Sequence, residues 1–573
     1  MKRIFLAAAA VIAAGTLEAA VDCRTRTFVG PTRIVWSTNA CGAAVLTSPR
    51  LGQVPEGRFL EGTGCRLEAG TNGAPSAVLL DFGRELHGAL QIGNGAAGRG
   101  ARARVRFGES ASEAMAELGE KGAQNDHAIR DSVIDLPWAG SREIGNAGFR
   151  FVRIDAVRGT VDLQFVRAVE LMRPMRRLGS FRSSDERLNR IFETAVRTVH
   201  LCSQEYLWDG IKRDRLVWIG DLHPEAMAVL NVFGAAPVLR ETFDYSIAVT
   251  PPDVWMNTMP TYTLWWLRDL AAWFRFTGDA DYLARHADYL ERTFDHVLAG
   301  FGADGRWTAG NFLDWPTEHN AAAATAGTQG LALLAARDVL VLAQALGRDG
   351  LADKARTAIA RLEKLTALDP AGAKSAAALL ALSGLRDPKE MFADVLGPRG
   401  HTGVSTFYGY YMIEAMSAAG EHQRALDTVR DYWGAMLDVG ATSFWEDFNL
   451  AWTNNCFRID ELPVAGKKDV HGDYGEFCYE GFRHSLCHGW SAGPASWCIN
   501  RVLGIRAADV GCKVVEVRPN LGDLEWAEGA MALPDGNSIF VRVERGRDGR
   551  PSLTVRAPDW VKVVRQTPGG RGG

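Results

Sequence analysis

The chain begins with short runs in which apolar and polar residues alternate. From about residue 24 to 175 these runs are separated by Gly and Pro, and the clearest are AVLLDFGREL, GALQIGNG, ARARVRFGES, FRFVRIDAV and VDLQFVRAVEL. Alternation with a period of two, with a turn signal about every ten residues, is typical of antiparallel strands. We therefore predict an N-terminal antiparallel β-sandwich over residues 21–177.

From about residue 180 the apolar spacing becomes helical. Segments such as DERLNRIFETAVRTVHLCSQEYL, PTYTLWWLRDLAAWFRFTGD and QGLALLAARDVLVLAQALGRDG place apolar residues at i, i+3, i+4 and i+7. About a dozen such segments follow in pairs, and each pair can bury its apolar face only against its neighbours. This pattern predicts an (α/α)6 barrel over residues 178–508. Alternation then returns in KVVEVRPN, NSIFVRVERG and SLTVRAPDW, which predicts a small C-terminal β-sandwich over residues 509–567.

The N-terminus has the layout of a secretory signal. Lys2 and Arg3 precede an apolar run over residues 4–14, and small residues continue to Ala19 and Ala20. The run is too short to cross a bilayer, and we expect no membrane span elsewhere. We therefore expect residues 1–20 to be a signal peptide and the protein to be exported, to the periplasm or the exterior. A buried N-terminal helix is the alternative.

Composition narrows the classes of partner. The 573 residues include 64 basic and 68 acidic side chains, for a net charge of −4, so there is no positive field to hold a nucleic acid. The nine cysteines form no C-x-x-C pair, and we expect no metal site. In an oxidising compartment two bridges are conceivable. The candidates are Cys23, Cys41 and Cys65 for one bridge, and Cys478 with Cys487 or Cys498 for the other.

The first loop that can carry chemistry is WDGIKRDRLVWIGD. It crowds three carboxylates, those of Asp209, Asp214 and Asp221, among basic residues and two Trp just before a helix. Like charges held close disfavour mutual ionisation, and a flanking indole lowers the local dielectric. One of the three can therefore stay protonated near neutral pH and act as a general acid. A solvated charged loop is the plain alternative.

The second loop, GATSFWEDFNLAWTNN, places Glu446 beside Trp445. Hydrolysis of a glycoside with inversion needs two facing carboxyl groups, one to protonate the leaving oxygen and one to activate water. Glu446 is a candidate for the base, although it could equally cap a helix or lie at the surface. Its rivals as base are Asp447, Glu461, Glu476 and Glu480.

Two further loops have residues suited to binding a sugar. FRHSLCHGWSAGPASW sets His484 and His488 among Gly and Trp, and His488 could bond a sugar hydroxyl, or be an ordinary core histidine. NFLDWP holds Asp314 and Trp315, and the indole could stack on the apolar face of a sugar.

At these motifs the sequence resembles the α-L-rhamnosidases of glycoside hydrolase family 78, and the resemblance covers nearly the whole mature chain. WDGIKRDRLVWIGD is similar to the acid loop of that family, with Asp214 where the family has its acidic Glu. The segment around Glu446 resembles the T-T-x-W-E-x-W phrase that holds the base, and SLCHGWSAGP resembles S-x-x-H-G-W-x-A-x-P. The family has N-terminal β-sandwich modules, a catalytic (α/α)6 barrel and a C-terminal β-sandwich, in the order predicted above.

The resemblance implies an exo-acting hydrolase that removes terminal α-L-rhamnose from a glycoside, an oligosaccharide or a polysaccharide side chain. It implies Asp214 as the general acid and Glu446 as the general base, with no metal or organic cofactor. Either Lys212 or Arg213 could take the place of the sugar-binding arginine of the family, and we assign Arg213. The substrate-binding residues expected with it are Asp209, Trp218, Asp221, Trp315, Trp445 and His488.

Two alternatives stay open. The altered acid loop, with Gly210-Ile211 for Cys-Pro and Val217 for Gly, fits an exo-hydrolase of another sugar, such as a uronic acid or a modified deoxy sugar. A non-catalytic exported carbohydrate-binding protein is the other alternative, in which the carboxylates only bond sugar hydroxyls.

Overall fold

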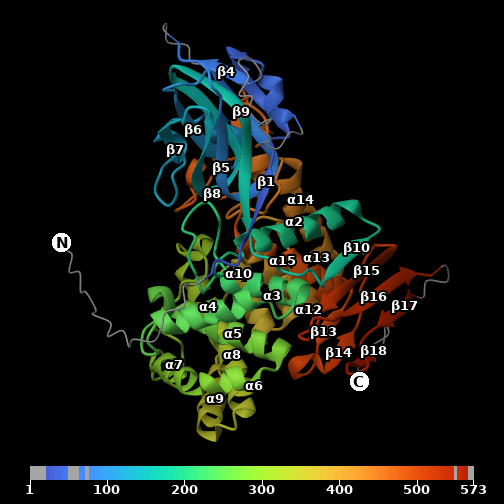
Figure 1. Cartoon of the computed structure of the whole chain (residues 1–573). Coiled ribbons are helices and arrows are strands. Elements are labelled where there is room, and N and C mark those ends of the chain that lie inside the picture. Colours follow the sequence, from blue (N-terminus) through green and yellow to red (C-terminus); the bar gives the residue numbers. More distant parts are fainter. Residues whose placement is uncertain (1–20, 49–63, 71–75, 547–550, 566–573) are drawn as a thin grey trace.

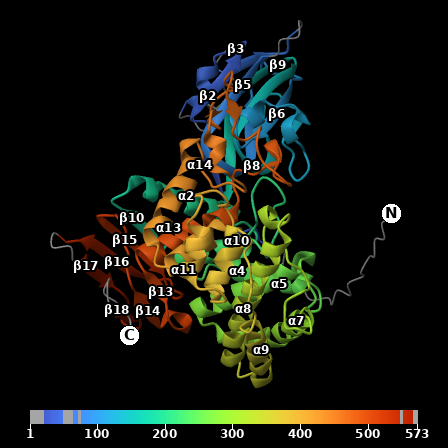
Figure 2. The same cartoon turned by 180° about the vertical axis from the view of Figure 1, so that it is seen from behind.

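The protein is described by a computed structural model over residues 21–48, 64–70, 76–546 and 551–565. The predicted signal peptide at residues 1–20 lies outside these residues. Figure 1 shows an N-terminal sheet, a central helical part and a C-terminal group of strands beside the helices. The view from behind shows the same three parts (Figure 2). The predicted fold class, an (α/α)6 barrel flanked by two β domains, is therefore confirmed.

The N-terminal strands form one continuous antiparallel sheet. Its main path runs β3-β4-β9-β5-β8-β6-β7, with β1 added on β9 and β2 on β5. Two runs predicted as separate strands, residues 77–86 and 88–95, are one strand, β5, which continues through shifts in register near Asp81 and Gly88. The strands are β1 (Thr25–Val29), β2 (Arg33–Thr38), β3 (Ala40–Cys41), β4 (Cys65–Glu68), β5 (Ala77–Asn94), β6 (Arg102–Gly108), β7 (Asp131–Asp135), β8 (Gly140–Arg158) and β9 (Thr160–Met172).

Alternate residues of these strands face two different neighbours. On β5, Val78 and Leu80 belong to the main core of the sheet, whereas Leu79 packs with Phe151 against the short helix α1 (Ala111–Met115). This is the period of two on which the prediction rested.

Twelve helical segments, counted over the described part of the chain, make two layers of a barrel. The inner helices contact one another in a closed ring and are buried almost all round, whereas outer helices such as α2 and α7 bury one stripe. The inner helices are α3 (Leu222–Phe233), α5 (Pro260–Thr277), α8 (Ala321–Ala345), α10 (Lys374–Ser383), α12 (Gly409–Ala418) and α15 (Gly493–Trp497). The outer ones are α2 (Glu186–Cys202), α4 (Pro237–Val249), α6 (Ala280–Arg285) with α7 (Ala287–Ala299), α9 (Asp349–Leu362), α11 (Pro388–Met391), and α13 (His422–Thr428) with α14 (Gly434–Asp438).

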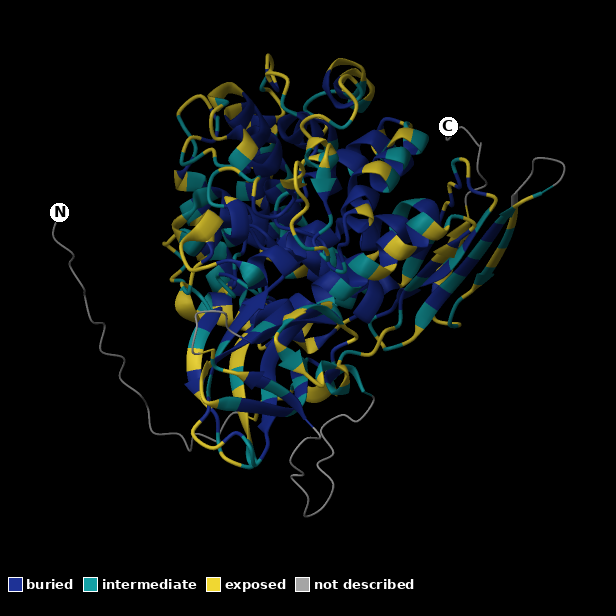
Figure 3. Ribbon diagram, turned by 90° about the horizontal axis from the view of Figure 1, so that it is seen from above, coloured by how far each residue is buried: buried dark blue, intermediate teal, exposed yellow. Residues whose placement is uncertain are grey.

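Helix α8 is long and apolar enough to cross a membrane by composition, yet most of it is buried in the inner ring. An inner helix of a barrel needs an apolar surface all round because it packs on both sides. Figure 3 shows the buried residues running through the middle of the helical part and into the adjoining sheets.

The C-terminal strands form two sheets, and each sheet includes one strand from outside the predicted C-terminal domain, residues 509–567. The four-stranded sheet has the order β10-β15-β16-β17 and the three-stranded sheet the order β13-β14-β18. Strand β10 precedes the barrel, and β13 precedes residue 509, so the boundaries predicted at 178 and 509 are corrected for these two strands. The strands are β10 (Ser180–Ser183), β13 (Ile505–Ala507), β14 (Val514–Val517), β15 (Trp526–Ala532), β16 (Ser538–Arg545), β17 (Pro551–Arg556) and β18 (Lys562–Arg565).

All nine cysteines lie in the described residues, and all are free thiols. Neither of the two conceivable bridges is therefore formed in this structure. Cys41 on β3 lies opposite Arg66 on β4, one position away from Cys65.

Candidate functional site

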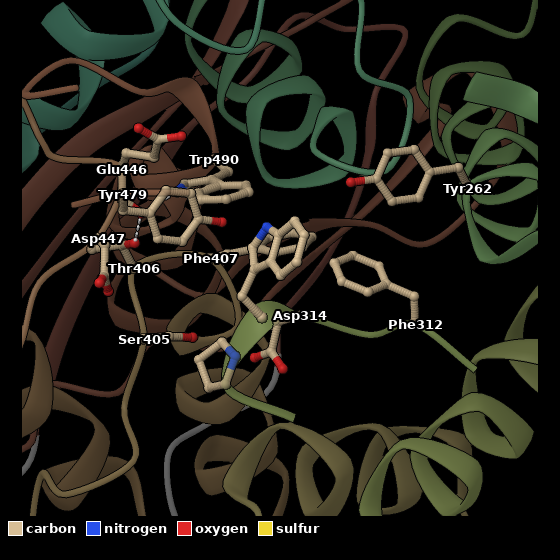
Figure 4. Close-up of a pocket in the computed structure, with 12 residues that line it drawn as sticks. Tyr262, Phe312, Asp314, Ser405, Thr406, Phe407, Glu446, Asp447, Tyr479 and Trp490 are labelled. Atoms are coloured by element: carbon tan, nitrogen blue, oxygen red, sulfur yellow. Dashed lines mark hydrogen bonds between the residues drawn. The ribbon is translucent and has the colours of Figure 1, made fainter. Parts of the chain in front are cut away.

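A hollow of about 360 Å³ lies where loops of the helical part meet. In Figure 4, Phe407, Tyr479 and Trp490 gather on one side, while Tyr262 and Phe312 lie on the other. The remaining lining residues are Asp314, Trp315, Pro316, Ser405, Thr406, Glu446 and Asp447. The pocket thus combines aromatic walls with three carboxyl groups.

Glu446 is placed by two antiparallel loop segments. Its backbone N–H donates to Ser485 O at 2.9 Å, and His488 N–H donates to Phe444 O at the same distance. The carboxylate is buried, with Oε2 accepting the Ser485 N–H at 3.0 Å and Oε1 accepting from Arg213 Nη2. Burial raises the pKa of Glu446 above the usual range of a glutamate, and the Arg213 charge opposes that shift.

Asp214 lies in the acid loop between α2 and α3. Its Oδ2 accepts the indole N–H of Trp218 at 3.1 Å, and its Oδ1 lies 3.7 Å from Arg213 Nη1. The carboxyl group is partly open to solvent, with a side-chain exposure of 18%. One guanidinium therefore contacts the carboxyl groups of both Asp214 and Glu446.

The structure separates the roles of the two adjacent basic residues. Arg213 turns toward Glu446, and its carboxylate neighbours raise the pKa of Arg213 although burial alone would lower it, so the guanidinium stays charged. Lys212 turns away, and its Nζ donates to the carbonyl oxygens of Phe482 and His484 at 2.6 and 2.8 Å. Of the two, only Arg213 contacts the other candidate residues of the site.

Three carboxyl groups lie within 4.0 Å of one ring nitrogen of His488. Its Nε2 lies 3.7 Å from Asp209 Oδ2, 3.8 Å from Glu446 Oε1 and 4.0 Å from Asp221 Oδ2. Burial raises the pKa of both aspartates well above the usual range, and burial together with the Arg213 charge lowers the pKa of His488 well below its own. Protonated aspartates beside a neutral imidazole can both donate and accept hydrogen bonds, as sugar hydroxyls require.

Further hydrogen bonds hold the acid loop in place. Asp209 Oδ1 accepts the Leu216 N–H at 2.8 Å, and Asp221, just before α3, accepts the Tyr262 hydroxyl at 3.2 Å. The Gly489 N–H donates to Asp209 O at 2.7 Å, which joins this loop to the loop of His488.

The three predicted tryptophans have different positions. Trp315 lines the hollow, as a stacking wall would. Trp218 is engaged by Asp214 through its N–H. Trp445 is fully buried and packs edge-on against Phe448 and His484, so the expectation that it contacts substrate is corrected. The side chain of Glu446 lines the hollow, whereas the indole of Trp445, one residue earlier, turns into the core.

Among the rival bases only Asp447 lines the hollow. Burial raises its pKa to about 7. Glu461, Glu476 and Glu480 are exposed.

Several residues at the site had no signal in the sequence. Tyr262 lies in a helical apolar pattern that predicts only core, and Tyr479 lies in a segment without periodicity. The N-terminal sheet also reaches the site, because Glu109 at the end of β6 accepts the Leu486 N–H at 2.6 Å, and His127 contacts Asp214. Residues so distant in sequence carry no mark of this contact.

Three buried side chains, those of Glu109, Glu113 and His471, are close enough to offer ligands to one metal ion. The Lys212 ammonium lies 3.3 Å from Glu109 Oε2 and 2.9 Å from Glu113 Oε1. The Lys212 ammonium therefore provides the positive charge beside these carboxylates. The cluster fits a buried ion-pair network better than a metal site.

Comparisons with known proteins agree with this architecture. Residues 176–354 match the family model of the bacterial α-L-rhamnosidase six-hairpin glycosidase domain. Curated protein sequences give no match. Solved structures similar to this chain include three rhamnosidases. The family 78 rhamnosidase of Bacillus sp. GL1 has 23% identity and a TM-score of 0.70, and the match covers 88% of this chain and 54% of that one. The rhamnosidase from Klebsiella oxytoca with rhamnose bound has 19% identity and a TM-score of 0.64, and the match covers 83% of this chain and 96% of that one. The α-L-rhamnosidase from Aspergillus terreus has 17% identity and a TM-score of 0.69, and the match covers 88% of this chain and 61% of that one.

The structural similarity at these identities establishes the fold. The chain spans about half the length of the Bacillus protein and nearly all of the Klebsiella protein. Residues 176–354 are thus similar to the bacterial α-L-rhamnosidase six-hairpin glycosidase domain.

Proposed function

We propose that the protein is an exported, exo-acting glycoside hydrolase that removes terminal α-L-rhamnose with inversion of the anomeric carbon. The observation that carries the proposal is the pair of carboxyl groups, Asp214 and Glu446, that both contact Arg213, with Glu446 lining a hollow of about 360 Å³. The Arg213 guanidinium contacts the two carboxyl groups through different nitrogens, Nη1 for Asp214 and Nη2 for Glu446. This favours the spacing of about 6.5–9.5 Å that lets a water molecule attack directly.

In the proposed reaction Asp214 donates its proton to the glycosidic oxygen as the bond to the anomeric carbon breaks. Glu446 takes a proton from the water that attacks the opposite face of that carbon. Asp209, Asp221 and His488 bond the sugar hydroxyls, and Trp315 covers an apolar face.

The Klebsiella neighbour and the Streptomyces avermitilis α-L-rhamnosidase are both solved with rhamnose. This supports a rhamnose-containing substrate for the present chain. A second candidate is hydrolysis of another terminal sugar, favoured by the shorter acid side chain at Asp214 and by the ionisable Asp447 in the same hollow.

The test is incubation of the purified protein with an aryl α-L-rhamnoside and a panel of other aryl glycosides, including uronides. The anomeric proton of the released sugar is followed by NMR. Initial release of β-L-rhamnose supports the proposal, whereas initial α-L-rhamnose contradicts direct displacement. Release of a different sugar supports the second candidate, and binding without release from any glycoside supports a carbohydrate-binding protein.

Three variants then assign the carboxyl groups. Asp214→Asn and Glu446→Gln are each expected to lower kcat by about 100-fold or more, with an unchanged melting temperature. Asp447→Asn should retain most activity if Glu446 is the base. The reverse order, with Glu446→Gln active and Asp447→Asn inactive, would transfer the role of base to Asp447.

A further inference from the structure

The acid loop has a backbone conformation that it cannot hold by itself. Asp214 and Arg215 have φ values of +53° and +56°, two consecutive left-handed residues that are not glycine. The left-handed region brings Cβ of an L-residue too close to the following carbonyl oxygen. Such a turn persists only when surrounding contacts fix it.

Those contacts come from the N-terminal β domain. The Asp214 N–H donates to His127 Nδ1 at 2.8 Å. Arg215 donates through Nη1 to Asn146 O at 2.6 Å and through Nη2 to His127 O. The two left-handed residues are therefore both held by a segment that lies more than 60 residues away in the sequence.

His127 also meets the carboxyl group of Asp214. Its Nδ1 lies 3.0 Å from Asp214 Oδ1, while Trp218 bonds Oδ2 from the other side. Because Nδ1 accepts the backbone N–H, the ring proton is on Nε2, which lies 3.3 Å from Asp126 Oδ2. Asp126 thereby orients the ring, and the ring holds the backbone of Asp214 next to its carboxyl group.

We propose that His127 is a positioning residue for Asp214, through which the N-terminal β domain completes the catalytic site of the barrel. The inference rests on the proposed role of Asp214 as general acid. His127 touches no reacting atom in this proposal. It keeps the acid loop in its left-handed turn, so that the carboxyl proton reaches the leaving oxygen.

Leaving groups of different basicity provide the test. A poor leaving group, such as an alkyl alcohol, needs a well-placed proton, whereas dinitrophenolate leaves with little help from an acid. We expect His127→Ala to lower kcat by about 10–100-fold on an alkyl α-L-rhamnoside and by less than about threefold on the dinitrophenyl one. Glu446→Gln should slow both substrates alike, because activation of water is needed for either.

A conservative variant guards against simple loss of folding. His127→Asn offers an amide oxygen near the place of Nδ1 and should restore the alkyl-rhamnoside rate to within a few-fold of wild type. His286→Ala is the matched control, because His286 also faces an aspartate, Asp244, at 3.5 Å but lies in the outer helical layer. Its activity should stay unchanged on both substrates.

The inference is overturned if His127→Ala slows both rhamnosides equally, leaves both unchanged, or is not improved by asparagine. A wild-type protein that releases no rhamnose but another sugar would reject the proposed substrate instead. The same comparison would then be made on aryl and alkyl glycosides of that sugar, so the two failures are distinct.

Discussion

Arg213 and Glu446 form an ion pair that is almost wholly buried, with side-chain exposures of 8% and 3%. Few interactions outside the pair offset the cost of holding two charges away from water. The carboxylate has one more hydrogen bond, from the Ser485 N–H. The ionised state of Glu446 therefore depends on Arg213.

The first prediction concerns the pH dependence of activity. Arg213→Met removes the charge that lowers the pKa of Glu446, leaving burial to raise it further. The base must be ionised to act, so the acid limb of the kcat/KM profile should move to higher pH by about 1–3 units. Arg213→Lys keeps a charge and should move the limb less. Profiles with coincident acid limbs would contradict the dependence of Glu446 on Arg213.

The second prediction concerns the packing of the acid loop. A Cβ at Gly220 would lie 2.2 Å from Cε1 of Tyr262, whose ring belongs to an inner helix and whose hydroxyl bonds Asp221. Gly220→Ala must therefore displace Tyr262 or the loop, and kcat/KM should fall by about 10-fold or more.

The control for that prediction is Gly350→Ala on α9. No atom lies within 4 Å of a Cβ at Gly350. The change should leave activity unaltered and stabilise the protein by up to about 1 kcal/mol. Equal activity of the two variants would show that the contact with Tyr262 does not shape the site.

Much of the site could be predicted because each loop has its own readable signal. Asp209 and Asp221 frame a dense group of charges, and Glu446 and His488 lie in Trp- and Gly-bearing loops between helices. The barrel brings these loops to one place. The error at Trp445 has a local cause, since neighbouring residues of an extended segment point to opposite sides, and Glu446 takes the side of the hollow.

What could not be predicted comes from long-range contacts. His127 and Glu109 lie in polar segments of the β domain, and nothing in their own sequence indicates which loop they will meet. Strand β10 is four residues long and pairs with β15, over 340 residues later. Short-range periodicity reports which face of an element is buried, but not which distant polar group it meets.

The third prediction concerns stability. Glu225 is buried on α3, its Oε2 has no hydrogen-bond partner among the described residues, and burial with nearby carboxylates raises its pKa well above the usual range. A carboxyl group with a raised pKa binds its proton more tightly in the folded state, so its contribution to stability falls as pH rises above the unfolded pKa.

Glu225→Gln removes that penalty. Relative to wild type, its free energy of unfolding should rise by about 1 kcal/mol for each pH unit between pH 5 and 8. Denaturant unfolding at several pH values measures this slope. Glu525→Gln, at an exposed position, should give a flat difference, and a flat difference for Glu225→Gln as well would show that its carboxyl group is not held protonated.

The last prediction concerns the join between the β domain and the barrel. Lys212 is the cation for Glu109 and Glu113, and its charge opposes the burial that raises the pKa of Glu109 to about 7. Lys212→Met keeps the length of the side chain but leaves the buried Glu109 without its counter-charge, and leaves Glu113 only Arg130, at 4.0 Å. We expect a loss of about 3 kcal/mol in the free energy of unfolding at pH 8.

The sign of the pH dependence distinguishes this mechanism from lost packing. Without Lys212 the pKa of Glu109 rises further, so the loss should shrink toward pH 5, where the Glu109 carboxyl group is protonated in the folded state at little cost. Adding Glu109→Gln to the variant should recover part of the stability at pH 8 and little at pH 5. Lys354→Met, which breaks a half-exposed pair with Asp295 on the outer layer, should cost less than about 1 kcal/mol at either pH. A loss for Lys212→Met that is equal at both pH values would instead attribute its effect to packing, because contacts of the aliphatic stem do not titrate.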